Sequence, residues 1–251
     1  MTLMQVWGAL VIFIVCPLIG GLPLIRWITL AFTRQKLDRL GTHNLSVSAA
    51  FYYGGRLAGI LSVVSEAAKG IACVLIARHF FPSDPAWEMI ALISLVMGRY
   101  WLANGAGTTN VVWGYIVHDP IAAGLVLLIA GIGFTIFRQR NQAKFGVLVL
   151  FPLITAALHP YDVERILATI ALAILLGWIY NKIPDDLALD PTRATSSSRK
   201  MFQFFRGDSS ADFFSYRGLR TLDQTLDPKK YGDKAASLSA LKRKGYAVPV
   251  G

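Results

Sequence analysis

Long apolar stretches separated by short polar segments make up the chain as far as residue 183. A helix needs about 20 apolar residues to cross the hydrocarbon core of a bilayer. We expect seven membrane helices, over residues 3–33, 57–76, 89–101, 110–117, 121–137, 145–158 and 163–180. The fourth is too short to cross at full thickness, and such a half-helix is tolerated where protein or a cavity covers its end. The pattern therefore predicts an all-α, polytopic membrane helix bundle.

The distribution of basic residues predicts how this bundle is oriented. No charged residue precedes the first apolar stretch, whereas Arg34, Lys36 and Arg39 follow it. Lys and Arg are enriched in cytoplasmic loops, so we expect the N-terminus outside and the loop after residue 33 in the cytoplasm. Seven crossings then place the C-terminus in the cytoplasm. Because no charged region precedes the first stretch, we interpret it as a membrane span rather than a cleaved signal peptide.

Composition supports the same class of protein. Of the 251 residues, 54% are hydrophobic and the mean hydropathy is +0.49, more than a soluble domain needs. The net charge of +10 comes from basic residues crowded in loops and tail, which gives no reason to expect nucleic-acid binding. Cys16 and Cys73 lie far apart in apolar stretches, so we interpret them as small buried hydrophobic residues without a neighbouring partner. No His, Cys and carboxylate cluster has ligand spacing, so neither metal nor cofactor is implied.

A charge pair lies inside the second apolar stretch. Glu66 and Lys69 are three residues apart, so they share a helix face and can pair. A charge at the centre of a bilayer costs about 2.5–3.5 kcal/mol on an insertion scale. Both residues must therefore face the bundle interior or a wet cavity. Two interpretations remain open, a structural ion pair and the wall of a functional site.

The polar segment ahead of this stretch combines small residues with flanking arginines. Arg39 and Arg56 bracket glycine, hydroxyl and amide residues, namely Gly41, Thr42, Asn44 and Ser48. Small residues of this kind let backbone N–H groups close around phosphate oxygens, and a helix N-terminus adds a favourable dipole. The segment predicts an anion site at a membrane surface.

The stretch from Arg39 to Gly70 resembles the first signature of the acyl-phosphate:glycerol-3-phosphate acyltransferases, the PlsY family of bacterial membrane enzymes. The matching residues are Gly41, Asn44, Phe51, Gly55, Lys69 and Gly70. The conservative replacements are Thr42, Ser48 and Glu66, and the departures are His43, Ser46, Ala49 and Tyr52. The spacing fits without gaps. Together with hydropathy, the resemblance covers about residues 5–190 and implies a seven-helix membrane fold.

A glycine-rich stretch, from Gly98 to Gly114, occupies the place of the second family signature. Gly98 matches, Arg99 replaces a histidine, and the glycine-rich loop survives as Gly105-Ala106-Gly107. The resemblance implies that Gly105 and Gly107 allow a close backbone approach to phosphate.

The lysine of that second signature is missing, because no lysine occurs between Lys69 and Lys144. Backbone N–H groups, Thr108 and Thr109 can still bind phosphate, and Arg99 can supply the lost charge through a bidentate fork. The alternative is an inactive site.

The closing family signature has two candidate positions. His159 to Leu167 resembles it, with Asp162 in place of asparagine, but the expected topology puts this string on the outer face. Asn181, followed by Lys182, lies at the inner end of the last helix, where the family carries the signature. We therefore prefer Asn181 as the third contribution.

The adjacent His118 and Asp119 precede Pro120. In the acyltransferases that use a His and an acid, the two residues are more widely spaced. We therefore expect a turn on the outer face here rather than a catalytic dyad.

The composition changes after Pro184. Residues 1–190 form the expected membrane domain, and residues 191–225, rich in Ser, Thr and basic residues, are interpreted as a flexible, soluble linker. Residues 226–251 resemble the opening of the ATP-grasp domain of phosphoenolpyruvate synthase and pyruvate phosphate dikinase, so we expect a fragment of a longer fusion.

The resemblance implies an enzyme of phospholipid synthesis in the bacterial inner membrane. Its substrates would be glycerol 3-phosphate and fatty acyl phosphate, its product lysophosphatidic acid, and its surroundings membrane lipid. Arg39, Thr42, Asn44 and Arg56 would hold phosphate, while Lys69 and Arg99 would supply catalytic charge. The alternative is a catalytically degenerate anchor for a fused phosphoenolpyruvate-utilising enzyme.

Overall fold

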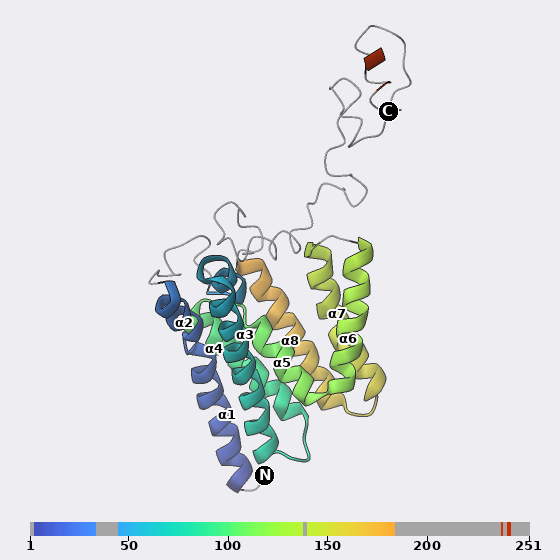
Figure 1. The fold of residues 1–251 in the computed structure, drawn as a ribbon. Helices are drawn as coiled ribbons and strands as arrows, with labels where there is room; N and C mark the ends of the chain where they lie inside the picture. The colour runs from blue at the N-terminus through green and yellow to red at the C-terminus, as the bar shows by residue number, and fades with distance from the viewer. Residues whose placement is uncertain (1–2, 34–44, 138–139, 184–236, 238–239, 242–251) are drawn as a thin grey trace. The chain divides into compact units, whose positions relative to one another are not determined.

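The computed structural model describes residues 3–33, 45–137, 140–183, 237 and 240–241. Its elements in the membrane domain are α-helices, and no strand occurs among the described residues. The helices are α1 (Leu3–Gly21), α2 (Leu24–Thr33), α3 (Val47–Phe80), α4 (Ala86–Ala103), α5 (Thr108–His118), α6 (Pro120–Phe137), α7 (Arg140–Leu158) and α8 (Val163–Lys182). The expected all-α bundle is confirmed (Figure 1).

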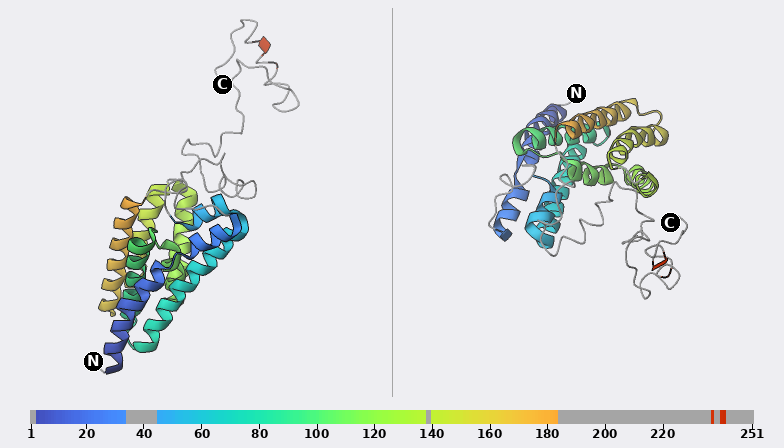
Figure 2. Two further views of the ribbon diagram at one scale, coloured as in Figure 1. Left: turned by 90° about the vertical axis from the view of Figure 1, so that its left-hand side faces the viewer. Right: turned by 90° about the horizontal axis from the view of Figure 1, so that it is seen from above.

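Helix α4 is the central helix of the bundle. It contacts α1, α3, α5 and α8, while α6 and α7 pack at one side through α5 and α8 (Figure 2). Met89, Leu92 and Leu95 on α4 are fully buried in the main hydrophobic core. Apolar side chains buried on nearly every side explain why α4 lacks a polar face.

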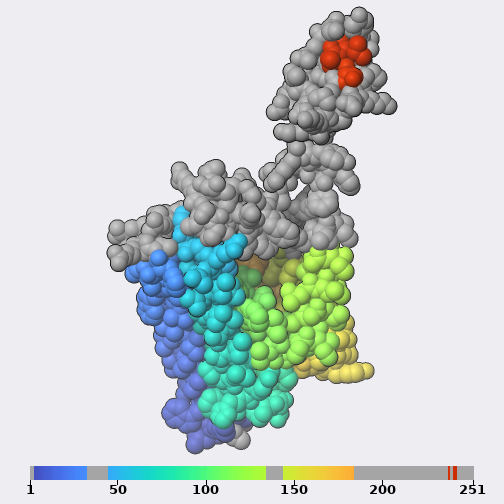
Figure 3. Space-filling model, in the orientation of Figure 1, coloured from blue at the N-terminus to red at the C-terminus, as the bar shows by residue number. Residues whose placement is uncertain are grey.

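The outer surfaces of the helices are apolar. Trp7 and Phe13 on α1, Leu57 on α3 and Leu128 on α6 are more than half exposed, and Figure 3 shows the face that blue α1, blue α2 and teal α3 help to form. Segments 3–32, 47–80 and 163–182 are long and apolar enough to cross a membrane, and 120–133 and 144–158 are shorter apolar helices. Exposed apolar surface of this extent suits a helix bundle surrounded by lipid.

The first expected span is two helices in the structure. Helix α1 ends at Gly21 and α2 begins at Leu24, so the chain breaks at Leu22-Pro23. Proline lacks the N–H that would continue the helical ladder. Helix α2 then packs on the start of α3, where Ile25, Leu45 and Ala50 form a second, smaller core.

Helix α3 begins ten residues earlier than the expected second span. Ser46 caps its N-terminus by accepting a hydrogen bond from the Ala49 N–H at 2.9 Å. The helix is interrupted at Gly55, whose φ of 82° lies in the left-handed region that favours glycine. Ser48, expected in a loop, therefore lies in the first turn of a helix.

The predicted burial of the two cysteines is confirmed. Cys16 on α1 and Cys73 on α3 are both fully buried, and the structure brings their thiols close together where the two helices meet. They are free thiols in the structure. Two residues 57 positions apart meet because α1 and α3 pack side by side.

Residues Asp208–Gly251 form a second unit, of which Ser237, Ala240 and Leu241 are described. The expected linker over 191–225 lies outside the described residues, as does nearly all of the fragment over 226–251. Both stay predictions.

Close helix packing at the α1–α4 crossing generates a prediction. A Cβ at Gly98 would overlap the backbone of Pro17, so Gly98→Ala should lower the free energy of unfolding by about 1–3 kcal/mol. Unfolding in mixed micelles with a denaturing detergent measures this. In the matched control, Gly131→Ala on α6, the added Cβ meets no atom within 4 Å and should leave stability unchanged or higher. Equal effects of the two substitutions would contradict the crossing.

Candidate functional site

A buried cluster of three charges joins α3 and α4. The Glu66 carboxylate accepts a hydrogen bond from Lys69 Nζ at 2.7 Å through one oxygen, and its other oxygen lies 3.2 Å from Arg99 Nε. The exposed fractions of these residues are 2% for Glu66, 4% for Lys69 and 2% for Arg99. The predicted pairing of Glu66 with Lys69 is confirmed, and the structure adds Arg99 to it.

The helices explain why these side chains meet. Glu66 and Lys69 are three residues apart on one face of α3, and Arg99 lies in the last turns of α4, which packs on α3. One carboxylate faces two cations, so the cluster carries one excess positive charge. Buried charges require partners of this kind, and the excess makes the region attractive to an anion.

Each cation also binds a backbone carbonyl where the chain is not helical. Lys69 Nζ donates to the Leu22 carbonyl at 2.6 Å, in the break between α1 and α2. Arg99 Nη2 donates to the Leu45 carbonyl, just before α3. The cluster therefore ties together two breaks that are far apart in sequence.

The glycine-rich loop between α4 and α5 lies directly against Arg99. A Cβ at Gly105 would come within 2.7 Å of Arg99 Nε, so a larger residue there would displace the guanidinium. The Gly105 N–H donates to the Arg99 carbonyl at 3.2 Å, and the Leu45 N–H donates to the Asn104 carbonyl at 3.4 Å. The end of the first predicted motif and the glycine-rich loop thus lie together around one guanidinium.

The N-terminus of α5 follows this loop. Gly107 precedes it with φ 73°, and no side chain caps the helix. The first-turn N–H groups of a helix have no intrahelical acceptor, and the helix dipole favours an anion there. Thr108, in this first turn, shares a hydrogen bond of 3.1 Å with the hydroxyl of Tyr180 on α8. Tyr180 was not singled out from the sequence, although its neighbour Asn181 was.

Buried donors remain near this loop. Arg99 Nη1 and both polar atoms of the Asn110 side chain have no hydrogen-bond partner among the described residues. Asn110 is 1% exposed and lies on α5 where that helix crosses Gly70 of α3. Buried polar groups are nearly always satisfied, so these atoms are suited to a polar ligand. Asn110 belongs to the glycine-rich stretch but was not singled out from the sequence.

The remaining predicted residues are not brought into the Lys69–Glu66–Arg99 cluster by the described part of the structure. Arg39, Gly41, Thr42 and Asn44 lie outside the described residues. Arg56 is exposed just after the Gly55 kink. Asn181 is exposed at the end of α8, and its amide donates to the Gly177 carbonyl of the same helix at 3.1 Å.

An apolar cavity lies beside the glycine-rich loop, between α5, α6, α7 and α8. Thr108 and Tyr180 are at one end of it. Its walls are apolar side chains, among them Val111, Val126 and Leu176. The cavity, of about 80 Å³, can hold part of an alkyl chain next to a polar, anion-attracting loop.

A second buried polar network lies at the opposite end of the bundle. Glu88, in the first turn of α4, accepts hydrogen bonds from Arg78 at 2.7 and 3.0 Å and contacts His118 Nδ1 at 2.8 Å. Arg165 binds His118 Nε2 at 2.9 Å and Asp119 at 2.8 Å. Because Arg165 donates to Nε2, neutral His118 carries its proton on Nδ1, from which it donates to Glu88.

The expected turn at His118 and Asp119 is present, but both residues are buried in this network rather than at a surface. Burial alone would raise the pKa of Asp119, yet hydrogen bonds from the Ala122 N–H and His159, with the charge of Arg165, outweigh it and lower that pKa. Every polar group here has a protein partner, which indicates that the network holds the ends of α5, α6 and α8.

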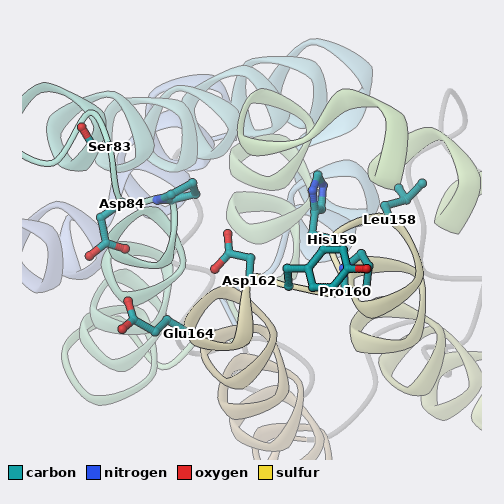
Figure 4. A pocket seen from close by; sticks show the side chains of 9 residues that line it. Ser83, Asp84, Leu158, His159, Pro160, Asp162 and Glu164 are labelled. Carbon is teal, nitrogen blue, oxygen red and sulfur yellow. The ribbon is translucent and has the colours of Figure 1, made fainter.

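His159 and Asp162 belong to this opposite end. They border an open hollow that Asp84 and Glu164 also line (Figure 4). Glu88 and Arg99 are 11 residues apart on α4, which is about 16 Å along a helix. The string from His159 to Arg165 is therefore distant from the Lys69–Glu66–Arg99 cluster.

Comparisons with known proteins agree on one family. The family model described as glycerol-3-phosphate acyltransferase matches residues 10–187. A glycerol-3-phosphate acyltransferase of Methylococcus capsulatus is 26% identical over 141 residues, which cover 54% of this chain and 70% of the relative. The crystal structure of PlsY, an integral membrane glycerol 3-phosphate acyltransferase in its glycerol 3-phosphate form, shares the fold, with a TM-score of 0.60 and 19% identity, over 69% of this chain and 88% of that one.

The three-charge cluster generates a prediction for stability. Glu66→Ala leaves the Lys69 and Arg99 charges buried without their carboxylate, so the free energy of unfolding should fall by about 3–5 kcal/mol. Mixed-micelle unfolding measures the change. Glu164→Ala removes an exposed carboxylate and should stay within about 0.5 kcal/mol of the unsubstituted protein. A loss for Glu66→Ala no larger than for this control would show that the cluster does not stabilise the fold.

Proposed function

The chain belongs to the glycerol-3-phosphate acyltransferase family, and we propose that it transfers a fatty acyl group from acyl phosphate to the 1-hydroxyl of glycerol 3-phosphate. The product is lysophosphatidic acid, which enters phospholipid synthesis. The observation that carries this proposal is the Lys69–Glu66–Arg99 cluster under the glycine-rich loop, beside the uncapped N-terminus of α5. Both substrates are phosphate anions, and this region offers positive charge and free N–H donors.

The transfer depends on positioning of the two substrates rather than on covalent catalysis by a side chain. The 1-hydroxyl oxygen of glycerol 3-phosphate attacks the acyl carbonyl carbon, the bond from that carbon to the phosphate oxygen breaks, and the hydroxyl proton leaves with inorganic phosphate. A preorganised positive site stabilises the negative charge that develops on the phosphate and carbonyl oxygens. The reaction therefore requires two bound phosphates close together rather than a nucleophilic side chain.

We propose that some of these groups position the site and others bind the substrates. Arg99 uses two of its nitrogens on Glu66 and Leu45, and Lys69 is held by Glu66 and Leu22. We therefore assign to both cations the electrostatic field of the site, and to Arg99 the positioning of the glycine-rich loop. Arg99 Nη1 remains for a substrate oxygen.

Direct phosphate contacts come from other groups in this proposal. Gly107 and Thr108 present backbone N–H groups and a hydroxyl at the start of α5, while Gly105, whose N–H donates to the Arg99 carbonyl, allows a close approach of the backbone. Arg39, Gly41, Thr42 and Asn44 would close over the phosphates from the loop ahead of Leu45, supported by Ser48, Arg56 and Asn181. The acyl chain lies in the apolar cavity between α5 and α8.

We further propose seven crossings of a bacterial inner membrane, with α1 and α2 as one and the short α5 as another. The N-terminus is then outside, and the glycine-rich loop and the C-terminus face the cytoplasm. Glycerol 3-phosphate is a cytosolic metabolite, so this orientation puts the site where the acceptor is available. Membrane lipid surrounds the bundle and takes up the product.

Acyl transfer by the purified full chain tests the proposed function. In detergent or lipid, with radiolabelled glycerol 3-phosphate, we expect product from acyl phosphate and none from acyl-CoA run in parallel. Arg99→Ala should lower kcat/KM at least tenfold, because the loop loses its tie to Glu66 and Leu45.

Three other results would change this conclusion. Product from acyl-CoA alone would overturn the donor assignment. No product from either donor, with the fold intact, would favour a degenerate membrane anchor. Full activity of Arg99→Ala would remove Arg99 from the site.

Thiol labelling tests the orientation. Ser83 follows α3 and Lys182 ends α8, both are exposed, and the native cysteines are buried. A membrane-impermeant maleimide should label Ser83→Cys in intact spheroplasts and Lys182→Cys only after permeabilisation. Reversed labelling would invert the proposed topology.

A further inference from the structure

We propose that the Tyr115–Phe151 ring pair is the floor of the acyl-chain cavity and sets the length of acyl chain that the enzyme transfers. This inference rests on the proposed function. It goes further by assigning a specificity role to side chains far from both phosphates. Four features carry it: a polar mouth, an apolar bore, a fixed floor, and buried charges beneath that floor.

The mouth of the cavity marks where the acyl head group lies. Thr108 and Tyr180 share their hydrogen bond there, one residue after Gly107 of the glycine-rich loop. A donor whose phosphate is held at the start of α5 therefore has its carbonyl carbon beside this hydroxyl pair. From that point, an alkyl chain has an apolar path down the cavity.

The bore has only aliphatic or aromatic walls below the mouth. Val111 and Val112 on α5, Val126 on α6 and Leu148 on α7 line it. Leu127 also lines it while being 52% exposed, so one side of the cavity reaches the lipid-facing surface. A lipid-dissolved donor can therefore enter sideways, with its chain already in apolar surroundings.

Two aromatic rings close the far end. The centroids of Tyr115 and Phe151 are 4.1 Å apart, and both side chains are buried. The Tyr115 hydroxyl lies 2.9 Å from Thr155 Oγ1, and the Thr155 hydroxyl donates to the Phe151 carbonyl at 3.0 Å. Thr155 thus has its proton committed and accepts from Tyr115. These hydrogen bonds hold the Tyr115 ring in place, and the Phe151 ring packs against it.

Buried charges beneath the floor prevent the cavity from extending. Tyr115 stacks on His118 with ring centroids 5.8 Å apart, and His118 contacts Glu88 and Arg165. An alkyl chain pushed past the rings would separate these paired groups, and an unpaired buried charge is costly. Methylenes beyond the floor therefore lower affinity instead of raising it.

The depth of the cavity follows from α5. Thr108 at the mouth and Tyr115 at the floor are seven residues apart, which corresponds to about 10 Å along the helix. An alkyl chain shorter than a common membrane acyl chain already spans this depth when extended, so the floor selects against the longer donors. The position of the floor then decides which chain fits best.

Two substitutions move the floor in opposite directions. Phe151→Ala deepens the cavity, and Ala123→Leu, at the floor end of α6, fills it. We would measure kcat/KM of the purified full chain with hexanoyl, octanoyl, decanoyl and lauroyl phosphate, whose extended lengths bracket the depth of the cavity. Relative to the unsubstituted protein, the ratio of the longest to the shortest donor should rise roughly tenfold in Phe151→Ala and fall roughly tenfold in Ala123→Leu.

A matched control separates the floor from a general loss of packing. Phe145→Ala makes the same chemical change on the same helix, but Phe145 is exposed and does not line the cavity, so the length profile should not move.

The outcomes distinguish this inference from the function on which it rests. An unsubstituted protein without activity toward any donor overturns the proposed function and this inference with it. Activity with parallel losses across all donors in Phe151→Ala and Ala123→Leu overturns the floor alone. If added lipid changed the activity of the two variants while their preference among donor lengths stayed that of the unsubstituted protein, a membrane lipid chain, and not the donor, would occupy the cavity.

Discussion

The buried carboxylate of Glu66 is the point on which the half of the bundle around the glycine-rich loop depends. It holds Lys69 on its own helix and Arg99 on α4, and through them two backbone carbonyls at Leu22 and Leu45. Those carbonyls belong to breaks between helices, where backbone groups lose their helical partners. Inside an apolar bundle such groups must be satisfied by protein. One charge cluster thus makes irregular backbone tolerable at the place where a ligand site needs it.

A second buried polar network, at the far end of the bundle, also satisfies groups at helix ends, but in the described part of the chain it leaves no site for a ligand. Glu88, His118, Asp119 and Arg165 satisfy one another, with Arg78 and His159 completing the set. In the cluster around Glu66, by contrast, Arg99 Nη1 and the nearby Asn110 amide have no partner among the described residues. A fully paired network rigidifies helix ends, whereas unpaired donors suit a site that binds. The central helix α4 carries Glu88 of one network near its start and Arg99 of the other near its end, so the two networks are separated by most of the length of the helix.

Hydropathy predicted the helical class and the positions of most helices, and the three-residue spacing on a helix face predicted the pairing of Glu66 with Lys69. These depend on spacing along one segment, which a single sequence contains. What could not be predicted depends on which helices become neighbours. Arg99 and Leu45 are 54 residues apart, Thr108 and Tyr180 are 72 apart, and the thiol contact between Cys16 and Cys73 needs α1 beside α3. The early start of α3 was missed because the Ser46 cap and the Gly55 kink turn a polar loop pattern into helix.

The missing lysine of the glycine-rich loop is best understood through net charge. Two cations around one carboxylate leave an excess of one positive charge, buried where the dielectric is low and Coulomb interactions are strong. An excess of this kind is costly until an anion arrives, so the proposed binding of phosphate would recover free energy that was lost on folding. Arg99 sits behind Gly105 rather than within the loop, so in the proposed site its charge acts through the loop backbone, with Nη1 left for one substrate oxygen. In the proposed enzyme a loop lysine is then dispensable as long as the two cations outnumber the carboxylate.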